Sequence, residues 1–319
     1  MNIFKSLNIR RGIAIAALIA GATAMSAENG TNGYEYLSVP VSVHSAALGG
    51  FNATIAEDDI SLVYENPALL TNVSDKTLGL GFTSYIAKTT KLSAAWAQGL
   101  GERAVWSANV QYLSYGSMKE TDETGQEIGK LSASDVSVQG SFAYMLTDYI
   151  SGGVTAKFMF SNYASYNAFA MGVDLGLNYL NTDAGTSLSI VGRNLGGQIK
   201  AFYDKHEKLP FDLCLGFSQE LANAPLRFSV TLDDITHWKN INFIQHFIFG
   251  VDVFPSKNVW IAVGYNVRRQ HEMKVLDSSH WAGWSIGGGI NIKKIKVGVA
   301  YGKYHIAANS LLCNLSYSF

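Results

Sequence analysis

Two short motifs in this chain contain residue types that are found in catalytic sites. Gly283-Trp-Ser-Ile-Gly287 matches the Gly-x-Ser-x-Gly pattern of serine hydrolases, whose serine lies on a sharp turn between a strand and a helix. Here an expected strand simply continues through Gly288-Gly-Ile-Asn-Ile292, so Ser285 lacks that position. His271-Glu272 lacks the second histidine of a zinc-protease helix, and the seven histidines show no ligand spacing. We therefore expect a protein that is not an enzyme, with no cofactor and no metal site.

Four charged residues recur at positions that alternation assigns to one face of successive strands. Arg193, Asp212, Arg227 and Asp252 would all point into the lumen of a barrel. There they could pair with each other or with a segment inside the barrel. A substrate filter is the second interpretation of the same residues. We favour the first, a polar lumen whose charges are satisfied.

Apolar and polar side chains alternate almost everywhere from residue 78 onward, and signals for amphipathic helices are scarce. For example, Trp106 and Val110 alternate with Ser107 and Asn109. A wall with lipid outside and polar groups inside has this pattern. We therefore expect an all-β, transmembrane antiparallel β-barrel of about 14 strands. The expected strands are residues 78–85, 91–98, 104–115, 135–146, 150–161, 168–179, 187–195, 211–219, 226–234, 245–253, 259–267, 283–292, 296–303 and 310–319.

The connections between these strands alternate in length. Those at 146–150, 181–186, 255–258 and 293–295 are short, whereas those at 116–134, 196–210, 235–244 and 268–282 are long and polar. Short periplasmic turns and long external loops are typical of outer-membrane barrels, and a soluble sandwich has no reason to alternate them. If Phe319 lies in the periplasm, every long connection lies outside the cell.

The first residues indicate export from the cytoplasm. Residues 1–26 carry Lys5, Arg10 and Arg11, an apolar run and then small residues, which is the pattern of a signal peptide. Its removal would leave 21 Lys and Arg against 25 Asp and Glu, a net charge of −4, so nucleic acid is not an expected partner.

Cys214 and Cys313 are expected on opposite sides of the wall, as two buried free thiols.

Residues 27–76 lack the alternation and are expected to form a loop-rich plug, or hatch, ahead of the barrel at 77–319. Small inward residues in the last strands would leave room for it, although they could instead ease the curvature of the wall. Asp58 could cap a short helix through Tyr64, and Pro67 would stop that helix. The residues assigned to the plug motif are Gly49, Gly50, Asp58, Asp59, Asn66, Pro67 and Ala68.

The last strand ends on an aromatic residue. Leu315, Tyr317 and Phe319 share its apolar face, while Asn314, Ser316 and Ser318 lie on the other. A terminal aromatic on that face resembles the signal that the barrel assembly machinery reads when it inserts outer-membrane barrels. We therefore interpret Leu315, Tyr317 and Phe319 as an assembly signal.

The plug motif, followed by the β-rich chain with its Arg193-Asn-Leu-Gly196 segment, resembles the FadL-like outer-membrane superfamily. Within it, the opening at 34–50 and the segments at 209–211 and 224–227 are most similar to PorQ-like proteins of the PorV/PorQ branch. The resemblance implies a fourteen-stranded barrel with an N-terminal hatch. It also implies the outer membrane of a Bacteroidota-like Gram-negative bacterium, with lipopolysaccharide and outer-membrane lipid around the barrel. Its implied partners are type IX secretion proteins, PorZ-like and also PorU-like or PorV-like.

Two functions remain open at this point. The first, implied by the resemblance, is a non-enzymatic scaffold that docks PorZ-like partners of the cell-surface attachment complex through the segments at 116–130, 196–208 and 268–279. The alternative is a FadL-like channel for hydrophobic small molecules, which should need an interruption of the wall and an apolar path inside. Residues 104–115 contain neither Gly nor Pro, and the inward residues are polar or small, which favours the scaffold. A soluble secreted β-protein is a third interpretation.

Overall fold

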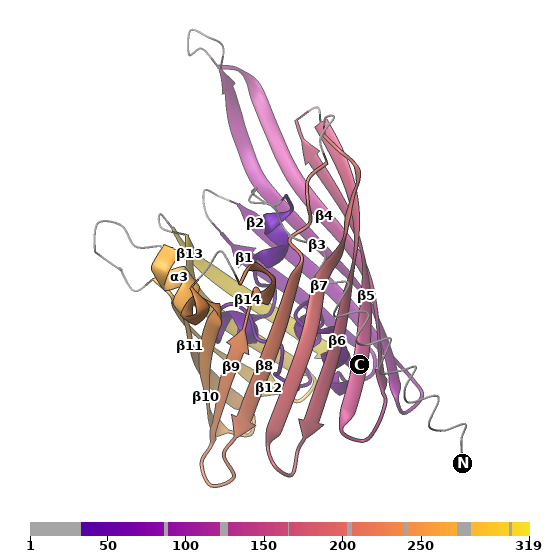
Figure 1. Cartoon of the computed structure of the whole chain (residues 1–319), viewed down its shortest axis with the longest axis vertical. Helices are drawn as coiled ribbons and strands as arrows, with labels where there is room; N and C mark the ends of the chain where they lie inside the picture. The colour runs from indigo at the N-terminus through magenta and orange to yellow at the C-terminus, as the bar shows by residue number, and fades with distance from the viewer. Residues whose placement is uncertain are drawn as a thin grey trace. The chain divides into compact units, whose positions relative to one another are not determined.

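The computed structural model describes residues 33–319, except 86–88, 122–126, 165, 203–205, 239–241, 273–281 and 306–307. Residues 33–76 form the hatch, and the rest form a closed barrel of fourteen antiparallel strands (Figure 1). The expected fold class and strand count are confirmed. The signal peptide expected at residues 1–26 lies outside the described residues.

Each strand pairs with its neighbours in the sequence, and β1 closes the barrel against β14. The strands are β1 (Thr77–Ser84), β2 (Thr90–Leu100), β3 (Ala104–Thr121), β4 (Glu127–Met145), β5 (Ile150–Tyr163), β6 (Tyr166–Asn181), β7 (Thr186–Lys200), β8 (Asp212–Glu220), β9 (Leu226–Leu232), β10 (Phe247–Ser256), β11 (Val259–Asn266), β12 (Trp284–Ile292), β13 (Ile295–His305) and β14 (Ala308–Ser318).

The wall places its apolar side chains outside, the reverse of a soluble protein. In β3, Val110 and Tyr112 are exposed while Ser107, Asn109 and Gln111 are buried. Lipid can cover the outer face, and the inner polar groups find partners in the lumen.

Cys214 is buried and Cys313 is half-buried, and both are free thiols, so the expectation that both would be buried was wrong for Cys313.

One of the long connections is largely strand and another is strand in part, which corrects the expected boundaries. β3 and β4 pair as far as Thr121 and Glu127, well beyond the expected ends at 115 and 135. β7 likewise continues to Lys200. In an antiparallel pair, each strand satisfies the backbone hydrogen bonds of the other whether or not the side chains are apolar. A strand can therefore continue through polar residues that show no alternation. Another connection contains α3 (Val267–Glu272).

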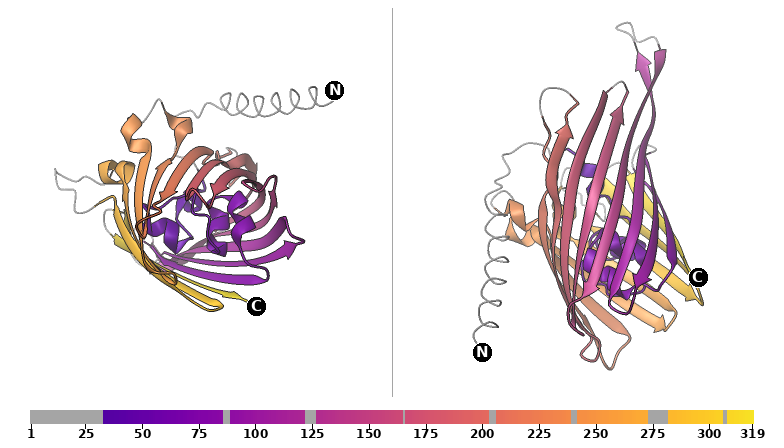
Figure 2. Two further views of the ribbon diagram at one scale, coloured as in Figure 1. Left: turned by 90° about the horizontal axis from the view of Figure 1, so that it is seen from below. Right: turned by 90° about the vertical axis from the view of Figure 1, so that its right-hand side faces the viewer.

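The hatch contains four short helical elements that lie inside the barrel, drawn in indigo in Figure 2. They are η1 (Glu35–Ser38), α2 (Val43–Ala47), η2 (Ile60–Tyr64) and η3 (Pro67–Asn72). Apolar residues of the hatch pack against small inward residues of the wall, such as Leu48 against Ala262 and Ala300 in one buried cluster. The hatch therefore supplies the hydrophobic core that the barrel lacks.

The helix cap in the hatch differs from the expectation. The carboxylate of Asp59, and not that of Asp58, accepts the amide hydrogen of Ser61 and caps η2. Asp58 instead accepts hydrogen bonds from the backbone and hydroxyl of Ser74. η2 ends at Tyr64, and Pro67 opens the next helix, where a missing amide hydrogen has no cost.

Among the described residues, no helix is long and apolar enough to cross a membrane.

Candidate functional site: the filled lumen

The hatch packs directly against the inner wall where the strands have glycine. A Cβ at Gly264 of β11 would overlap the backbone of Leu48 and Gly49. At Gly287 of β12 a Cβ would lie 2.7 Å from the Cβ of Ala47. These contacts support the interpretation that the inward glycines make room for an internal segment.

Side chains of the wall also hold the hatch backbone by hydrogen bonds. The hydroxyl of Ser285 donates to the carbonyl oxygen of Ala47 at 2.8 Å and accepts from the amide of Gly49 at 2.9 Å. Asn314 of β14 accepts from the amide of Val43 at 2.7 Å. Ser285 is the serine of the hydrolase-like motif. Its hydroxyl is occupied by hydrogen bonds to the hatch backbone, as donor and as acceptor, so it is not positioned as a nucleophile.

Four charged residues join the hatch to β9 and β10 in a closed ring, which we call the lumen charge cluster. Nε2 of His44 lies 2.7 Å from Asp252, and Nδ1 lies 3.2 Å from Glu57. Arg227 contacts the same two carboxylates at 2.7 and 2.8 Å. The imidazole also stacks on Trp260, with ring centroids 3.8 Å apart. Two residues of the hatch thus neutralise two of the wall, an arrangement that satisfies each buried charge.

Electrostatics stabilise the charged form of both hatch residues in this cluster. Burial opposes protonation of His44, but the carboxylates of Glu57 and Asp252 outweigh burial and raise the pKa of His44 to about 9. Burial opposes ionisation of Glu57, but His44 and Arg227 outweigh it and hold the pKa of Glu57 well below its usual value. His44 is therefore protonated and Glu57 ionised at neutral pH.

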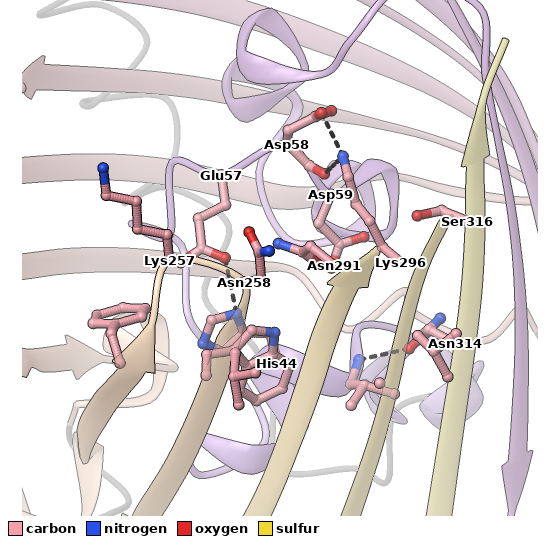
Figure 3. Close-up of a pocket in the computed structure, with 16 residues that line it drawn as sticks. His44, Glu57, Asp58, Asp59, Lys257, Asn258, Asn291, Lys296, Asn314 and Ser316 are labelled. Carbon is pink, nitrogen blue, oxygen red and sulfur yellow. Dashed lines mark hydrogen bonds and ion pairs between the residues drawn. The ribbon is translucent and has the colours of Figure 1, made fainter. Parts of the chain in front are cut away.

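A cleft of about 260 Å³ lies beside this cluster, between the hatch and the turn that joins β10 to β11 (Figure 3). Charged groups of both signs line it, including Glu57, Lys257 and Lys296. Lys296 pairs with Asp58. Such a surface suits polar solutes and water more than an apolar molecule.

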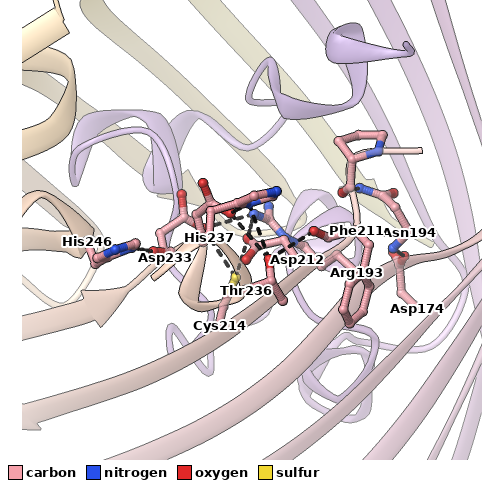
Figure 4. A network of polar contacts seen from close by, with 12 residues as sticks. Asp174, Arg193, Asn194, Phe211, Asp212, Cys214, Asp233, Thr236, His237 and His246 are labelled. Carbon is pink, nitrogen blue, oxygen red and sulfur yellow. Dashed lines mark hydrogen bonds and ion pairs between the residues drawn. The ribbon is translucent and has the colours of Figure 1, made fainter. Parts of the chain in front are cut away.

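A second cluster surrounds Arg193 of β7, at the start of β8 and the end of β9 (Figure 4). Its guanidinium bonds to Asp212 at 2.6 Å and to Asp233 at 2.9 Å, and lies over the ring of Phe51 of the hatch. Cys214 donates from its thiol to Asp212 at 2.8 Å. The structure thus brings Arg193 together with Asp212, and Arg227 with Asp252, but places the two pairs in separate clusters.

The groups of Asp212, Cys214 and Asp233 are close enough to share a metal ion, with their ligand atoms within 4.8 Å of one another. Arg193 already bonds to both carboxylates, however, and supplies the positive charge that an ion would bring. We assign no metal to this cluster.

The remaining residues of the plug motif fix the fold of the hatch. Gly49 and Gly50 have φ of +105° and +103°, a conformation that favours glycine. The side chain of Asn66 accepts from the amide of Ala68 at 2.9 Å and donates to Ser189 of the wall at 3.2 Å. The backbone of Pro67 and Ala68 leaves no space for a Cβ at Gly153 of β5.

Sequence reasoning missed His44, Glu57 and Asp233 as members of these clusters. Asp233 lies within the expected strand at 226–234, on the same face as Arg227, so the alternation could have placed it inside. His44 and Glu57 lie in a segment without periodicity, so no comparable signal identified them.

The residues assigned to the assembly signal lie on the outer face, where Leu315, Tyr317 and Phe319 are exposed. The ring of Phe319 contacts those of Tyr317 and Trp96, with centroids 4.8 and 5.6 Å away, and its amide donates to Lys76. The end of the chain is thus fixed across the β1–β14 seam. Its function in assembly stays a prediction.

No protein-family model and no curated protein matches the chain. Its fold is similar to those of a solved transporter and of a solved hydrocarbon channel. The toluene transporter TodX of Pseudomonas putida superposes with a TM-score of 0.56 at 12% identity, over 86% of this chain and 95% of that one. The monoaromatic hydrocarbon channel CymD superposes with a TM-score of 0.55 at 14% identity, over 88% of this chain and 98% of that one. At such identities the likeness shows a common fold.

Proposed function

We propose that this chain is an outer-membrane channel of a Gram-negative bacterium for hydrophobic small molecules, closed by its hatch in the state described above. The observation that carries this proposal is the likeness to hydrocarbon channels over nearly the whole length of both chains. That likeness favours the channel, the alternative in the sequence analysis, over the docking scaffold.

An apolar cluster inside the barrel supports the same proposal. Tyr34 and Tyr36 of the hatch pack there against Leu113, Met159 and Leu209. All five side chains are buried, and they surround a part of the lumen from which the hatch excludes water. A hydrophobic molecule could use this surface once the hatch segment moves.

Passage requires movement of the hatch because the wall is continuous. The pairing of β2 with β3 runs unbroken from Thr90–Ser114 to Leu100–Ala104. Inside the barrel, η2 contacts β2 and η3 contacts β3. Among the described residues, the wall between β2 and β3 therefore has no gap for lateral exit.

A cross-link between hatch and wall tests the proposal. The Cβ of Val43 lies 3.5 Å from the position that a Cβ would take at Gly298, which suits a disulfide. In a Cys214→Ala, Cys313→Ala background, Val43→Cys with Gly298→Cys should block cellular uptake of a labelled monoaromatic hydrocarbon when oxidised, and reduction should restore it. The two single-cysteine variants are the controls. If cells with the background protein take up the hydrocarbon no faster than cells without the chain, the channel proposal is overturned.

A docking scaffold is the second candidate, favoured by the shape of one hairpin. β3 and β4 extend past the other strands as a paired ribbon (Figure 1). Such a ribbon could bind a type IX secretion partner, PorZ-like, PorU-like or PorV-like, as the resemblance to the PorV/PorQ branch implies. Affinity capture from detergent-solubilised outer membranes of the native bacterium should then recover that partner with the full chain and lose it when residues 117–131 are replaced by a short turn.

A further inference from the structure

The barrel wall is short at β8 and β9, and β9 is its shortest strand. These strands have nine and seven residues, whereas β3 to β7 have between fourteen and nineteen. A strand that crosses a bilayer needs about 9–11 residues. On this side of the barrel, β9 is therefore too short to form the whole apolar belt by itself.

An apolar surface lies directly above the short strands. It consists of η5 (Ile235–His237) and η6 (Phe243–His246) together with Trp238 and Phe247, and we call it the aromatic ledge. Figure 2 shows these two helical turns outside the outline of the barrel, drawn in orange. Trp238, Phe243 and Ile244 expose 49%, 54% and 63% of their surface.

The ledge continues the lipid-facing surface of the wall without a break. Phe249 of β10 is one of the outward side chains that face lipid, and its ring stacks on Phe247 with centroids 5.8 Å apart. Phe247 contacts Phe243 at 5.1 Å, and Phe243 contacts Trp238 at 4.9 Å. Four rings thus form one row from the wall to the tip of the ledge.

Polar groups of the ledge point the other way and fix its position. His246 is buried, and its Nδ1 donates to the carbonyl oxygen of Asp233 at 2.9 Å. The hydroxyl of Thr236 donates to the carbonyl oxygen of Phe211 at 3.2 Å. Asp234 pairs with His237 and with Arg268 of α3. The charges are thus satisfied against the protein, and the described outer side chains of the ledge are the uncharged Trp238, Phe243 and Ile244.

We propose that the aromatic ledge is a membrane-binding surface that lies in the outer leaflet and completes the apolar belt where β8 and β9 are short. Its occupant is lipid, because the row of rings is continuous with the lipid-facing wall. Tryptophan and other amphipathic rings at the level of the head groups are typical of such a position. The proposal is independent of whether the barrel is a channel or a scaffold.

Quenching of tryptophan fluorescence tests the ledge. The full chain is refolded into phosphatidylcholine vesicles with either plain or brominated acyl chains, and the spectrum of Trp238→Phe is subtracted from that of the unmodified chain. The difference signal, which reports Trp238, should lose most of its intensity in brominated lipid and little on addition of aqueous iodide.

Two other tryptophans supply matched controls. Trp284 is on the outer face and 47% exposed, so the signal removed by Trp284→Phe should be quenched by brominated lipid. Trp260 stacks on His44 inside the lumen, so the signal removed by Trp260→Phe should not be. Ile244→Asp should reduce lipid quenching of Trp238, while heat-modifiable gel mobility shows that the barrel still folds.

Quenching of Trp238 by iodide but not by lipid would overturn the proposal and place the ledge in water. The proposal would also be overturned if neither brominated lipid nor iodide quenched Trp238 and if this protection increased with protein concentration. In that case the ledge binds a second copy of the chain.

Discussion

The Nε2 atom of His44 lies 2.7 Å from Oδ1 of Asp252, although 208 residues separate them in the chain. His44 belongs to the hatch and Asp252 to β10, so this contact joins the two parts of the molecule. Both side chains are almost completely buried. The contact is therefore a sensitive point for the stability of the closed state.

Asp252→Asn should destabilise the attachment of the hatch. It leaves His44 and Arg227 without one of their two carboxylates, and removing one partner of a buried ion pair costs about 3–5 kcal/mol. The expected result is cleavage of the hatch by added protease, in a barrel that keeps its heat-modifiable mobility. Asp148→Asn, at the exposed pair with Arg103, should change neither property. Equal protease resistance of both variants would show that the lumen charge cluster does not hold the hatch.

Alkaline pH should loosen the hatch. The pKa of His44 is raised from 6.5 to about 9 in the folded protein, so its charge contributes stability that is fully present below pH 6.5 and is lost as the pH rises through 9. The pKa of Glu57 is lowered in the folded protein. The charge of Glu57 therefore contributes stability at every pH above the usual pKa of a glutamate, and this stability is lost only when the pH falls through the lowered pKa. Protease sensitivity measured between pH 7 and 10.5 should therefore rise near pH 9. His44→Gln should remove that rise, and a rise unchanged in this variant would assign it to another group.

Gly264→Ala should displace the hatch without preventing formation of the barrel. Its new methyl group would overlap the backbone of Leu48 and Gly49, which cannot move as a flexible side chain can. Gly140→Ala is the matched control, because a Cβ there has nothing within 4 Å. Urea unfolding of the detergent-folded proteins should show a loss of about 1–3 kcal/mol for Gly264→Ala and little change for the control. Equal stability would mean that the hatch shifts at no cost.

Deletion of Phe319 should slow assembly in cells. The residue fixes the chain end against Tyr317, Trp96 and Lys76, and it carries the aromatic group expected of the assembly signal. The fraction of heat-modifiable barrel in outer membranes should fall, whereas Ser318→Ala should leave it unchanged. If the deleted protein assembles at the normal rate, the last residue is not the signal.

The wall could be predicted from the sequence because its physical cause is local. Lipid on one side and polar groups on the other impose a period of two, which residues 104–112 show directly, and neighbouring strands pair in order along the chain. The strand count and the inward position of Arg193 and Arg227 follow from that period. The extensions of β3, β4 and β7 could not be predicted, because a partner strand satisfies the backbone of a strand whose side chains do not alternate.

The site was decided by tertiary structure. The hatch has no repeating pattern, so nothing near His44 or Glu57 indicates that Asp252 and Arg227 will be their partners. Those partners are determined by which part of the wall the hatch packs against, and that depends on the glycines at 264 and 287 and on the hydrogen bonds of Ser285. From the residue pattern alone, a barrel with an apolar outer face, a polar interior and a plug could be predicted. Only folding brings together charges that are about two hundred residues apart, because a buried charge must find its partner in space and not along the chain.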